Sequence, residues 1–126
     1  MNDASITTHF SAKLESGVSC GPGTLISLHT GSDGILSARV ADHSDSYWAH
    51  GFALVSGSGT KVTGYAQRVR LDRVGVVDNV DYITLNPGSS IYLGEDGKYA
   101  ASGTQKVGFA LSSSIVFVDL DMQLGA

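Results

Sequence analysis

The chain is poor in the residues that build cross-linked or membrane-spanning proteins. It has one cysteine, Cys20, and two prolines among 126 residues. A single thiol permits no internal disulfide and no pair of thiolates for a metal ion, so we expect Cys20 to be buried and unreactive. No apolar run approaches the ~18 residues of a membrane span. Residues 1–4 are polar where a secretory signal would be apolar. These absences predict a protein made in a reducing cytoplasm, with no membrane as its partner.

Charge of either sign is also scarce. Asp, Glu, Lys and Arg make up 16% of the chain, against about 25% in typical soluble domains. The net charge of −4 gives no basic footprint for a nucleic-acid partner. The segment from Arg68 to Arg73 alternates apolar and charged residues, and we interpret it as the solvent face of a strand rather than a phosphate-binding site. The low charge favours surfaces that meet other protein instead of water.

Glycine, by contrast, is abundant, with 16 in 126 residues. Gly-rich turns separate short apolar or alternating runs, and no ten-residue segment has helical periodicity. Asn86-Pro87-Gly88 and Glu95-Asp96-Gly97 are strong turn signals, the second because Asp-Gly tolerates the positive φ of primed hairpin turns. Gly57-Ser58-Gly59 is predicted as a hairpin tip. The sequence predicts an all-β fold, a small β-barrel or β-sandwich. We expect residues 1–22 to be an N-terminal arm and lead-in, and 23–126 a single β-domain.

One short pattern occurs twice. The hexapeptide GFALVS begins at Gly51, and GFALSS begins at Gly108. A similar hairpin precedes each copy, so we predict two similar hairpin-plus-strand units, at about 23–66 and 88–120. Gly51 and Gly108 should open equivalent core strands, with Phe52 and Phe109 in equivalent environments. One of these phenylalanines buried and the other fully exposed would indicate a coincidence of short motifs.

No residue pattern predicts catalysis, a cofactor or a metal ion. Hydrolytic triads and paired carboxylates need side chains that converge, and serines are too plentiful here for a Ser/His/Asp trio to be informative. The acidic loop Asp42-His43-Ser44-Asp45 is the best metal candidate, but the second copy has Ser102-Gly103-Thr104-Gln105 at that place. We therefore interpret the loop as solvated and predict a non-enzymatic protein. The aromatic pairs Tyr47/Trp48 and Tyr92/Tyr99 are expected to pack within the fold.

The second half of the chain resembles small structural proteins of tailed bacteriophages. Its segment GSSIYLGEDGKY from Gly88, followed by QKVGFALS from Gln105 and an apolar closing strand, is similar to a hairpin and strand of that group. The resemblance extends over about Gly23 to Leu120. It implies a capsid decoration (cement) protein, a head fibre, or a module of the neck or tail. The acidic loop after Val40 departs from the tight connection usual in the group.

From this resemblance we expect a capsid decoration protein on the outer surface of the virion, with the major capsid protein as its partner. Self-association is also expected, as a homotrimer at a threefold site of the shell. The final strand, from Ser114 to Leu120, carries a single acid and is either central in its sheet or paired with a neighbouring subunit. We predict that residues 1–13 anchor the protein by ordering on a neighbour. The candidate partner-binding residues are Ile6, His9, Phe10, Lys13, Tyr47 and Trp48.

Two other functions remain open at this stage. One is a structural β-module of the neck, tail or baseplate, which would be present in few copies per particle. The other is a carbohydrate-binding module that reads host glycans through Tyr47, Trp48 or the loop from Asp42 to Asp45.

Overall fold

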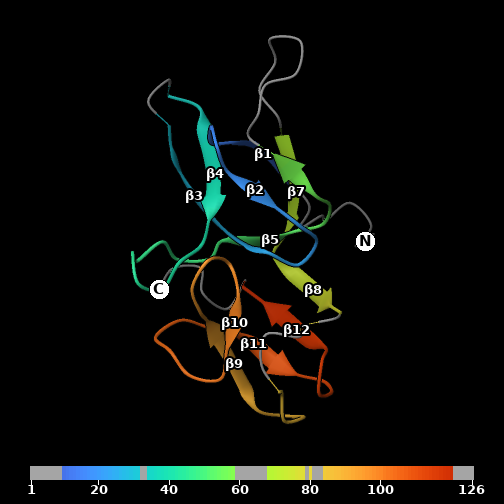
Figure 1. Ribbon diagram of the computed structural model, residues 1–126. Helices are drawn as coiled ribbons and strands as arrows, with labels where there is room; N and C mark the ends of the chain where they lie inside the picture. Colours follow the sequence, from blue (N-terminus) through green and yellow to red (C-terminus); the bar gives the residue numbers. More distant parts are fainter. Residues whose placement is uncertain (1–9, 32–33, 59–67, 79, 81–83, 121–126) are drawn as a thin grey trace, which may run out of the picture.

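The molecule has a β-barrel at one end and a second β-sheet at the other (Figure 1). The computed structural model describes residues 10–31, 34–58, 68–78, 80 and 84–120, and these residues form strands and turns without a helix. No helix among them is therefore a candidate membrane span. The prediction of an all-β fold, a small β-barrel or β-sandwich, is confirmed: the structure has a closed barrel with a second sheet.

The barrel closes because its first strand pairs on both sides. One neighbour lies antiparallel to it, with Ala12 opposite Val69, and the other lies parallel to it, with Leu14 opposite Ala38. Alternate residues of each strand point inward, and the enclosed side chains form a core that includes Ile26 and Leu71. In order around the barrel, the strands are β1 (Phe10–Leu14), β4 (Leu36–Val40), β3 (Leu25–Thr30), β5 (Gly51–Ala53) and β7 (Arg68–Asp72).

The segment expected as a lead-in contributes to this barrel. Of residues 1–22, the structure describes 10–22, and it pairs β1 with strands of its own chain. The short strand β2 (Ser19–Cys20) pairs with β6 (Gly57–Ser58). The prediction of a hairpin tip at Gly57 is wrong, because that residue lies in a paired strand. A Cβ at Gly57 would stand 2.8 Å from the Leu14 side chain, so the pairing places its backbone directly over the barrel core.

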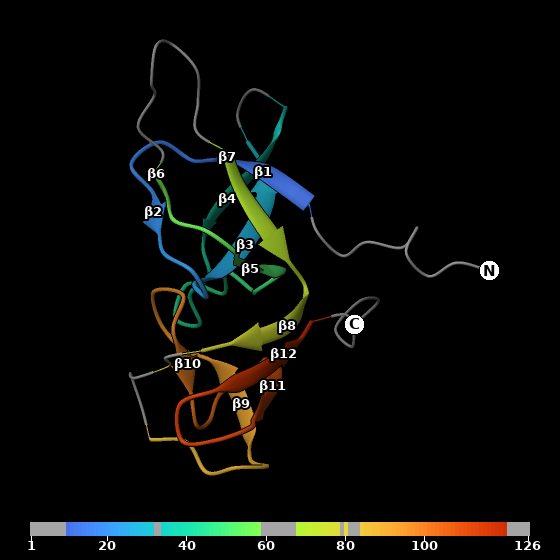
Figure 2. The ribbon, with the colours of Figure 1, turned by 90° about the vertical axis from the view of Figure 1, so that its right-hand side faces the viewer.

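The second sheet is open and packs against the outside of the barrel. Its strands occur in the order β10 (Tyr99–Ala100), β9 (Ser90–Leu93), β11 (Lys106–Ala110), β12 (Val116–Asp119) and β8 (Val74–Val77). β8 follows β7 after Arg73 and carries the chain from the barrel into this sheet (Figure 2). The Asp72 carboxylate fixes the bend by accepting hydrogen bonds from the backbone N–H groups of Arg73, at 2.7 Å, and Val74, at 3.2 Å. β12 lies between β11 and β8, so the closing strand is central.

The two halves share one connectivity, as expected of two similar hairpin-plus-strand units. Strands occur in the order β4-β3-β5-β7 in the barrel and β10-β9-β11-β12 in the second sheet. Each half begins with a Pro-Gly turn, in which Gly23 and Gly88 have φ of 88° and 85°. The N–H of Gly23 donates to the carbonyl of Ala53, and the N–H of Gly88 to that of Ala110, both at 2.7 Å. These equivalent bonds tie each turn to the Gly-Phe-Ala strand of its own unit.

The strand register is also the same in both units. Gly51 lies opposite Ile26 in the first unit, and Gly108 lies opposite Ile91 in the second. Both glycines face a carbonyl of the next strand: a Cβ at Gly51 would be 3.1 Å from the Asp72 oxygen, and one at Gly108 would collide with the Phe117 oxygen. This close approach explains why glycine is present in both copies. Gly51 opens its strand as predicted, whereas Gly108 lies in the middle of β11.

The predicted equivalence of Phe52 and Phe109 is wrong. Phe52 is 3% exposed and Phe109 is 40% exposed, although each occupies the same position in its unit. The reason is that the two units point the same way: the inner face of the second sheet packs on the outward face of the first unit. Ile91 and Ala110 on the inner face of the second sheet pack in one core with Leu25 and Phe52, which point out of the barrel. Among the described residues, no third unit covers the outer face of the second sheet, which carries Phe109.

Polar contacts fix the second sheet to the barrel. The Tyr99 hydroxyl donates to the carbonyl of Gly23 at 2.6 Å, in a buried site. The Gln105 side chain makes two bonds to the backbone of Ala49, accepting from its N–H at 2.8 Å and donating to its carbonyl at 2.9 Å. The hairpin turn at Gly97 inserts its backbone between Leu25 and Ala41, with bonds of 2.9 and 2.6 Å. The two units therefore present their free surfaces in a fixed geometry.

Candidate interaction surfaces

A row of basic and polar side chains crosses four strands of the barrel. The register places Arg68 of β7 opposite Lys13 of β1, Lys13 opposite Ser37 of β4, and Ser37 opposite His29 of β3. These residues alternate with inward-facing neighbours such as Val69 and Ala38, so the row lies on the outer wall. We call Arg68, Lys13, Ser37 and His29 the cationic row.

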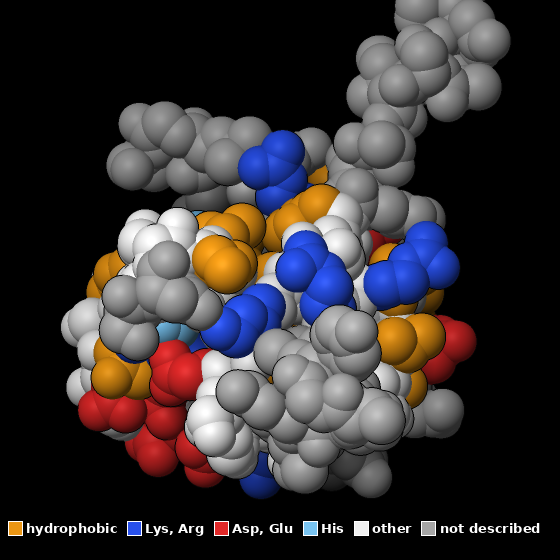
Figure 3. All heavy atoms as spheres, turned by 90° about the horizontal axis from the view of Figure 1, so that it is seen from above, with side chains coloured by type: hydrophobic (Ala, Val, Ile, Leu, Met, Phe, Trp, Pro, Cys, Tyr) orange, Lys and Arg blue, Asp and Glu red, His pale blue; other side chains and the backbone are white. Residues whose placement is uncertain are grey.

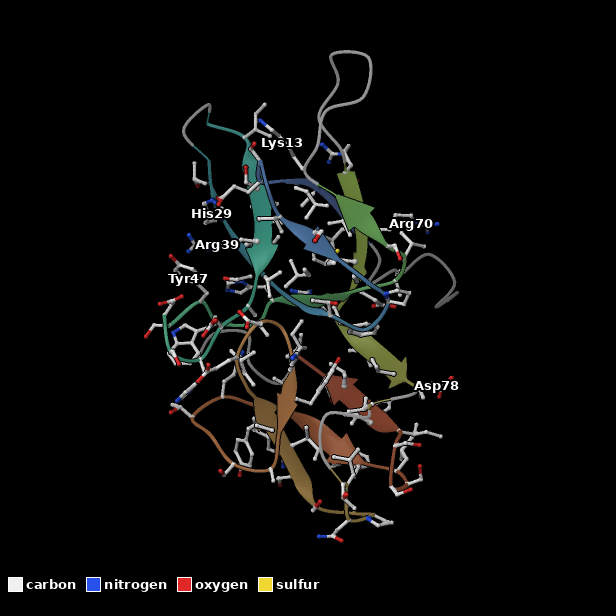
Figure 4. The ribbon with its side chains drawn as sticks, viewed as in Figure 1. Lys13, His29, Arg39, Tyr47, Arg70 and Asp78 are labelled. Carbon is white, nitrogen blue, oxygen red and sulfur yellow. The ribbon has the colours of Figure 1, made fainter. Side chains whose placement is uncertain are left out.

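Further cations flank the cationic row. Arg70 lies opposite Ser11 on the same wall, and Arg39 lies two residues beyond Ser37 on β4. Arg68 donates through Nη2 to the carbonyl of Ser11 at 3.1 Å, which holds its guanidinium over β1. In Figure 4, Lys13, His29 and Arg39 descend one side of the barrel, and Arg70 lies on the other side. The positive charge therefore wraps around the barrel wall.

Among the described residues, acidic side chains occur both beside this wall and in a separate group. Glu15 borders the row, and its Oε2 lies 2.7 Å from Nε2 of His29. A separate acidic corner forms where the loop after β4 meets the β9–β10 turn: Ser44 donates to Glu95 at 3.0 Å, and the Asp96 N–H donates to Asp42 at 3.3 Å. Seen from above the barrel, Lys and Arg spread across the surface, and Asp and Glu are visible as a larger group at the lower left and again at the right (Figure 3).

The barrel mouth beside the cationic row exposes two large apolar side chains. Ile35 is 49% exposed and Leu36 is 48% exposed. They lead into β4 directly before Ser37, and Leu36 lies opposite Thr30. Apolar side chains surrounded by charged groups are the usual anatomy of a protein–protein interface. Figure 3 shows hydrophobic side chains interspersed with the cations at this end.

Tyr47 and Trp48 lie in the loop that links β4 to β5. Tyr47 closes the loop by exchanging backbone hydrogen bonds with Asp42, each 2.9 Å long. The Arg39 guanidinium stands 3.5 Å from the centre of the Tyr47 ring, a cation–π contact that covers one face of that ring. Trp48 is 37% exposed and meets His43 edge to face at 6.2 Å. The Arg39 guanidinium therefore occupies one face of the Tyr47 ring.

The histidines do not assemble a metal site among the described residues, where no group of three His, Cys, Asp or Glu side chains could hold a metal ion. His50 has a structural contact: its Nδ1 accepts a 2.9 Å hydrogen bond from the N–H of Leu28. Burial, with a smaller contribution from the charge of Arg39, lowers the pKa of His50. The neutral ring is therefore the form that suits this hydrogen bond. Burial also raises the pKa of the Cys20 thiol, outweighing the effect of a backbone hydrogen bond with Gly57.

A second surface of different character lies on the outer face of the second sheet. Register places Ser90, Phe109, Phe117 and Val76 side by side across β9, β11, β12 and β8. The Phe109 and Phe117 rings are 5.4 Å apart, and Val76 is exposed. We call these four residues the apolar ladder. It occupies the face that, in the first unit, carries Leu25 and Phe52 and is covered by the second unit.

The predicted partner-binding residues fall in three places. Ile6 and His9 lie outside the described residues. Phe10 and Lys13 are in β1, where Phe10 packs partly on the barrel core and Lys13 belongs to the cationic row. Tyr47 and Trp48 lie at the acidic corner. The positions of Arg39 and Arg68 relative to Lys13 could not be predicted from the sequence, because they depend on pairings between distant segments. The one sequence feature that indicated these cations was the alternation of apolar and charged residues from Arg68 to Arg73.

Comparison with known proteins gives a likeness of fold. No protein-family model matches the chain, and no curated protein matches it. One solved structure is similar, described as the head fiber gp8.5 N base in bacteriophage phi29. The similarity has a TM-score of 0.62 and 15% sequence identity, and it covers 90% of this chain and 92% of the other. The architecture of a barrel with an attached sheet is therefore shared along nearly the full length of both chains.

Proposed function

We propose that this protein is a structural component of a tailed-phage virion, of the capsid decoration or head-fibre kind. The observation that carries the proposal is the shared fold over 90% of the chain with the head-fibre base of phi29. The phage-like segments from Gly88 to Tyr99 and from Gln105 to Ser112 support it independently of the fold. In this role the protein binds the outer surface of a shell formed by the major capsid protein.

The geometry of the molecule suits a structural role. The barrel and the second sheet are held rigidly by Tyr99, Gln105 and Gly97, and the described residues present large surfaces rather than a convergent set of reactive groups. A protein that stabilises a shell needs such fixed contact surfaces. We accordingly propose a non-enzymatic function without a cofactor.

Self-association as a homotrimer belongs to the same proposal. A trimer would match a threefold position on an icosahedral shell. The sequence left open whether the closing strand is central or pairs with a neighbouring subunit. Because β12 is central in its sheet, subunits of a trimer would meet through other surfaces. Sedimentation equilibrium tests the proposal directly, with an expected mass three times the 13.1 kDa of one chain. A single-chain mass at micromolar concentration would contradict it.

Copy number in the particle tests the proposed location. We expect quantitative mass spectrometry of purified particles to find this chain in hundreds of copies, in a constant ratio to the major capsid protein. Cryo-electron microscopy should then place it on the outside of the shell. A handful of copies at one vertex would instead identify a neck, tail or baseplate module, and absence from the particle would refute a virion role.

A further inference from the structure

We propose that the open edge of β8 is a site at which two copies of this chain pair, strand to strand, about a twofold axis. The axis passes beside Val76, so that each Val76 lies opposite its own copy and the second sheets of the two copies become continuous. The inference goes beyond the proposed function, because a twofold contact is distinct from the threefold one proposed above and would link one trimer to the next.

The first support is that one strand position pairs on both edges in the first unit and on one edge in the second. β8 pairs with β12 as β1 pairs with β7. β1 also pairs with β4 along its other edge, whereas β8 ends its sheet and has no second partner among the described residues. A strand in this position of the unit can therefore accept a further strand.

The hydrogen bonds of β8 identify the backbone groups that face its open edge. The N–H of Leu120 donates to the carbonyl of Arg73 at 2.9 Å, and opposite residues of an antiparallel pair alternate between bonded and non-bonded positions. Gly75 and Val77 therefore bond to β12 in the observed register. The N–H and the carbonyl of Val76 point the other way, to the open edge.

The stretch of this edge that can accept a strand is short and is centred on Val76. The N–H of Val74 also points away from β12, but it donates to the Asp72 carboxylate at 3.2 Å. In the proposed register, the two copies of Val76 exchange both their hydrogen bonds, and the carbonyl of Val74 faces the N–H of Asp78 in the other copy. Each Asp78 then lies opposite a valine, so the two carboxylates are not placed against each other.

The edge of β8 lacks the features by which proteins protect a free strand. Such edges usually carry a charged side chain, a proline or a bulge, or are very short. β8 has the sequence Val74-Gly75-Val76-Val77 and pairs with β12 in unbroken register. At the other end of the sheet, β10 is only two residues long, and the turn before it is inserted into the barrel through Gly97. The sheet is therefore protected at one edge and open at the other.

A second copy suits this short edge better than an extended peptide does. A peptide would have to be ordered on binding, at an entropic cost, and would gain only the few hydrogen bonds around Val76. β8 of a second copy is already fixed against its own β12, so it brings the same bonds without that cost. Val76 is 54% exposed, and opposite residues of a strand pair lie on one face, so each Val76 would also cover part of the other. The apolar ladders of the two copies would then join.

The first experiment removes the outward N–H. Val76→Pro takes away this donor, and proline is tolerated on an edge strand whose N–H has no partner in the sheet. The matched control, Val76→Thr, keeps the N–H and the shape of the side chain. In analytical ultracentrifugation over a concentration series, wild type should reach twice the mass of the Val76→Pro species, whatever oligomer the other surfaces form. We expect the dissociation constant of this doubling to rise at least about tenfold in Val76→Pro and to stay within about threefold in Val76→Thr. Circular dichroism and thermal melts check that both variants are folded.

The second experiment tests the geometry with a disulfide on the axis. Hydrogen-bonded opposite residues have Cα atoms about 5.5 Å apart, within the range that a disulfide spans. Val76→Cys in a Cys20→Ser background should therefore form covalent dimers with oxidised glutathione as the oxidant. The matched control is Val55→Cys between β5 and β6, which replaces the same residue type at a similar exposure, 46% against 54%. We expect at least about tenfold more covalent dimer from Val76→Cys than from the control.

The outcomes separate the inference from the proposed function. Covalent dimers without a trimer mass would refute the trimer and leave the twofold contact standing. No excess of disulfide over the control, with or without a doubling of mass, would overturn the inference. Equal losses in Val76→Pro and Val76→Thr would also overturn it, because the side chain and not the edge hydrogen bonds would then hold the copies together. In assembled particles, a photo-cross-linker attached at Val76→Cys that captures the major capsid protein instead of a second copy would assign the edge to that protein and overturn the inference.

Discussion

The two copies of the Gly-Phe-Ala motif provide a controlled test of how the units stack. Phe52 and Phe109 occupy the same position in strands of the same register, yet Phe52 is 3% exposed and Phe109 is 40% exposed. We predict that Phe52→Ala destabilises the protein far more than Phe109→Ala. The chemical change is identical, so the difference between the two variants reports on what covers each ring.

The structure sets the expected magnitudes. Phe52 packs in the core with Leu25 and the inner face of the second sheet, and Gly75 lies so close that a Cβ there would be 3.0 Å from the Phe52 ring. Removing a ring enclosed in this way costs about 3–5 kcal/mol. The Phe109→Ala change removes the contact with Phe117 and the partial burial of the ring. Together these losses should lower the free energy of unfolding by about 1–2 kcal/mol. Domains of this size have a stability of about 5–15 kcal/mol.

Urea unfolding followed by circular dichroism measures both free energies of unfolding. We expect the Phe52→Ala midpoint to fall by at least about twice as much as that of Phe109→Ala, with similar slopes against denaturant. Equal losses would refute the stacking of the second unit on the outward face of the first. The measurement should be repeated at several protein concentrations, because self-association through the apolar ladder would make the Phe109→Ala loss concentration-dependent.

Three further predictions follow from single contacts. Tyr99→Phe removes the buried donor to the Gly23 carbonyl and should lower the free energy of unfolding by about 1–3 kcal/mol, whereas Tyr92→Phe, on the outer face, should change it by less than about 0.5 kcal/mol. Gly108→Ala forces a Cβ into the Phe117 carbonyl, and we expect little folded protein in circular dichroism; a melt like that of wild type would contradict this. Because the folded pKa of His50 is lowered, the unfolded chain binds more protons below its ordinary pKa of about 6.5. Stability should therefore be full above that pH and fall as the pH drops below it, and His50→Gln should flatten this part of the pH profile measured by thermal melts.

Local signals in the sequence were sufficient to predict most strands and turns. The Asp96-Gly97 turn has φ of 55° and 73°, as its residue types predict. The alternation from Arg68 to Asp72 places Val69 and Leu71 inside and the arginines outside. These features depend on a few neighbouring residues, so composition and spacing are enough to predict them.

Pairings between strands that are distant in the sequence could not be predicted from such local signals. β1 closes the barrel by joining β4 in parallel and β7 in antiparallel orientation, and nothing in FSAKL indicates two partners so far along the chain. The cationic row depends on those pairings, so Lys13 could be proposed alone but not together with Arg68 and His29. The unequal burial of Phe52 and Phe109 could not be predicted for the same reason, because it depends on where the second unit packs against the first.

The shared connectivity of the two units, together with their different surroundings, explains why the molecule has two surfaces of different character. In the first unit, the outward face of β3 and β5 is used to hold the second unit, and β1 closes the barrel, which leaves a wall where charge can collect. In the second unit, β8 pairs with β12 as β1 pairs with β7, but the sheet stays open and its outer face keeps the apolar ladder. A charged wall and an apolar face fixed rigidly to each other would let one chain contact two chemically different neighbours.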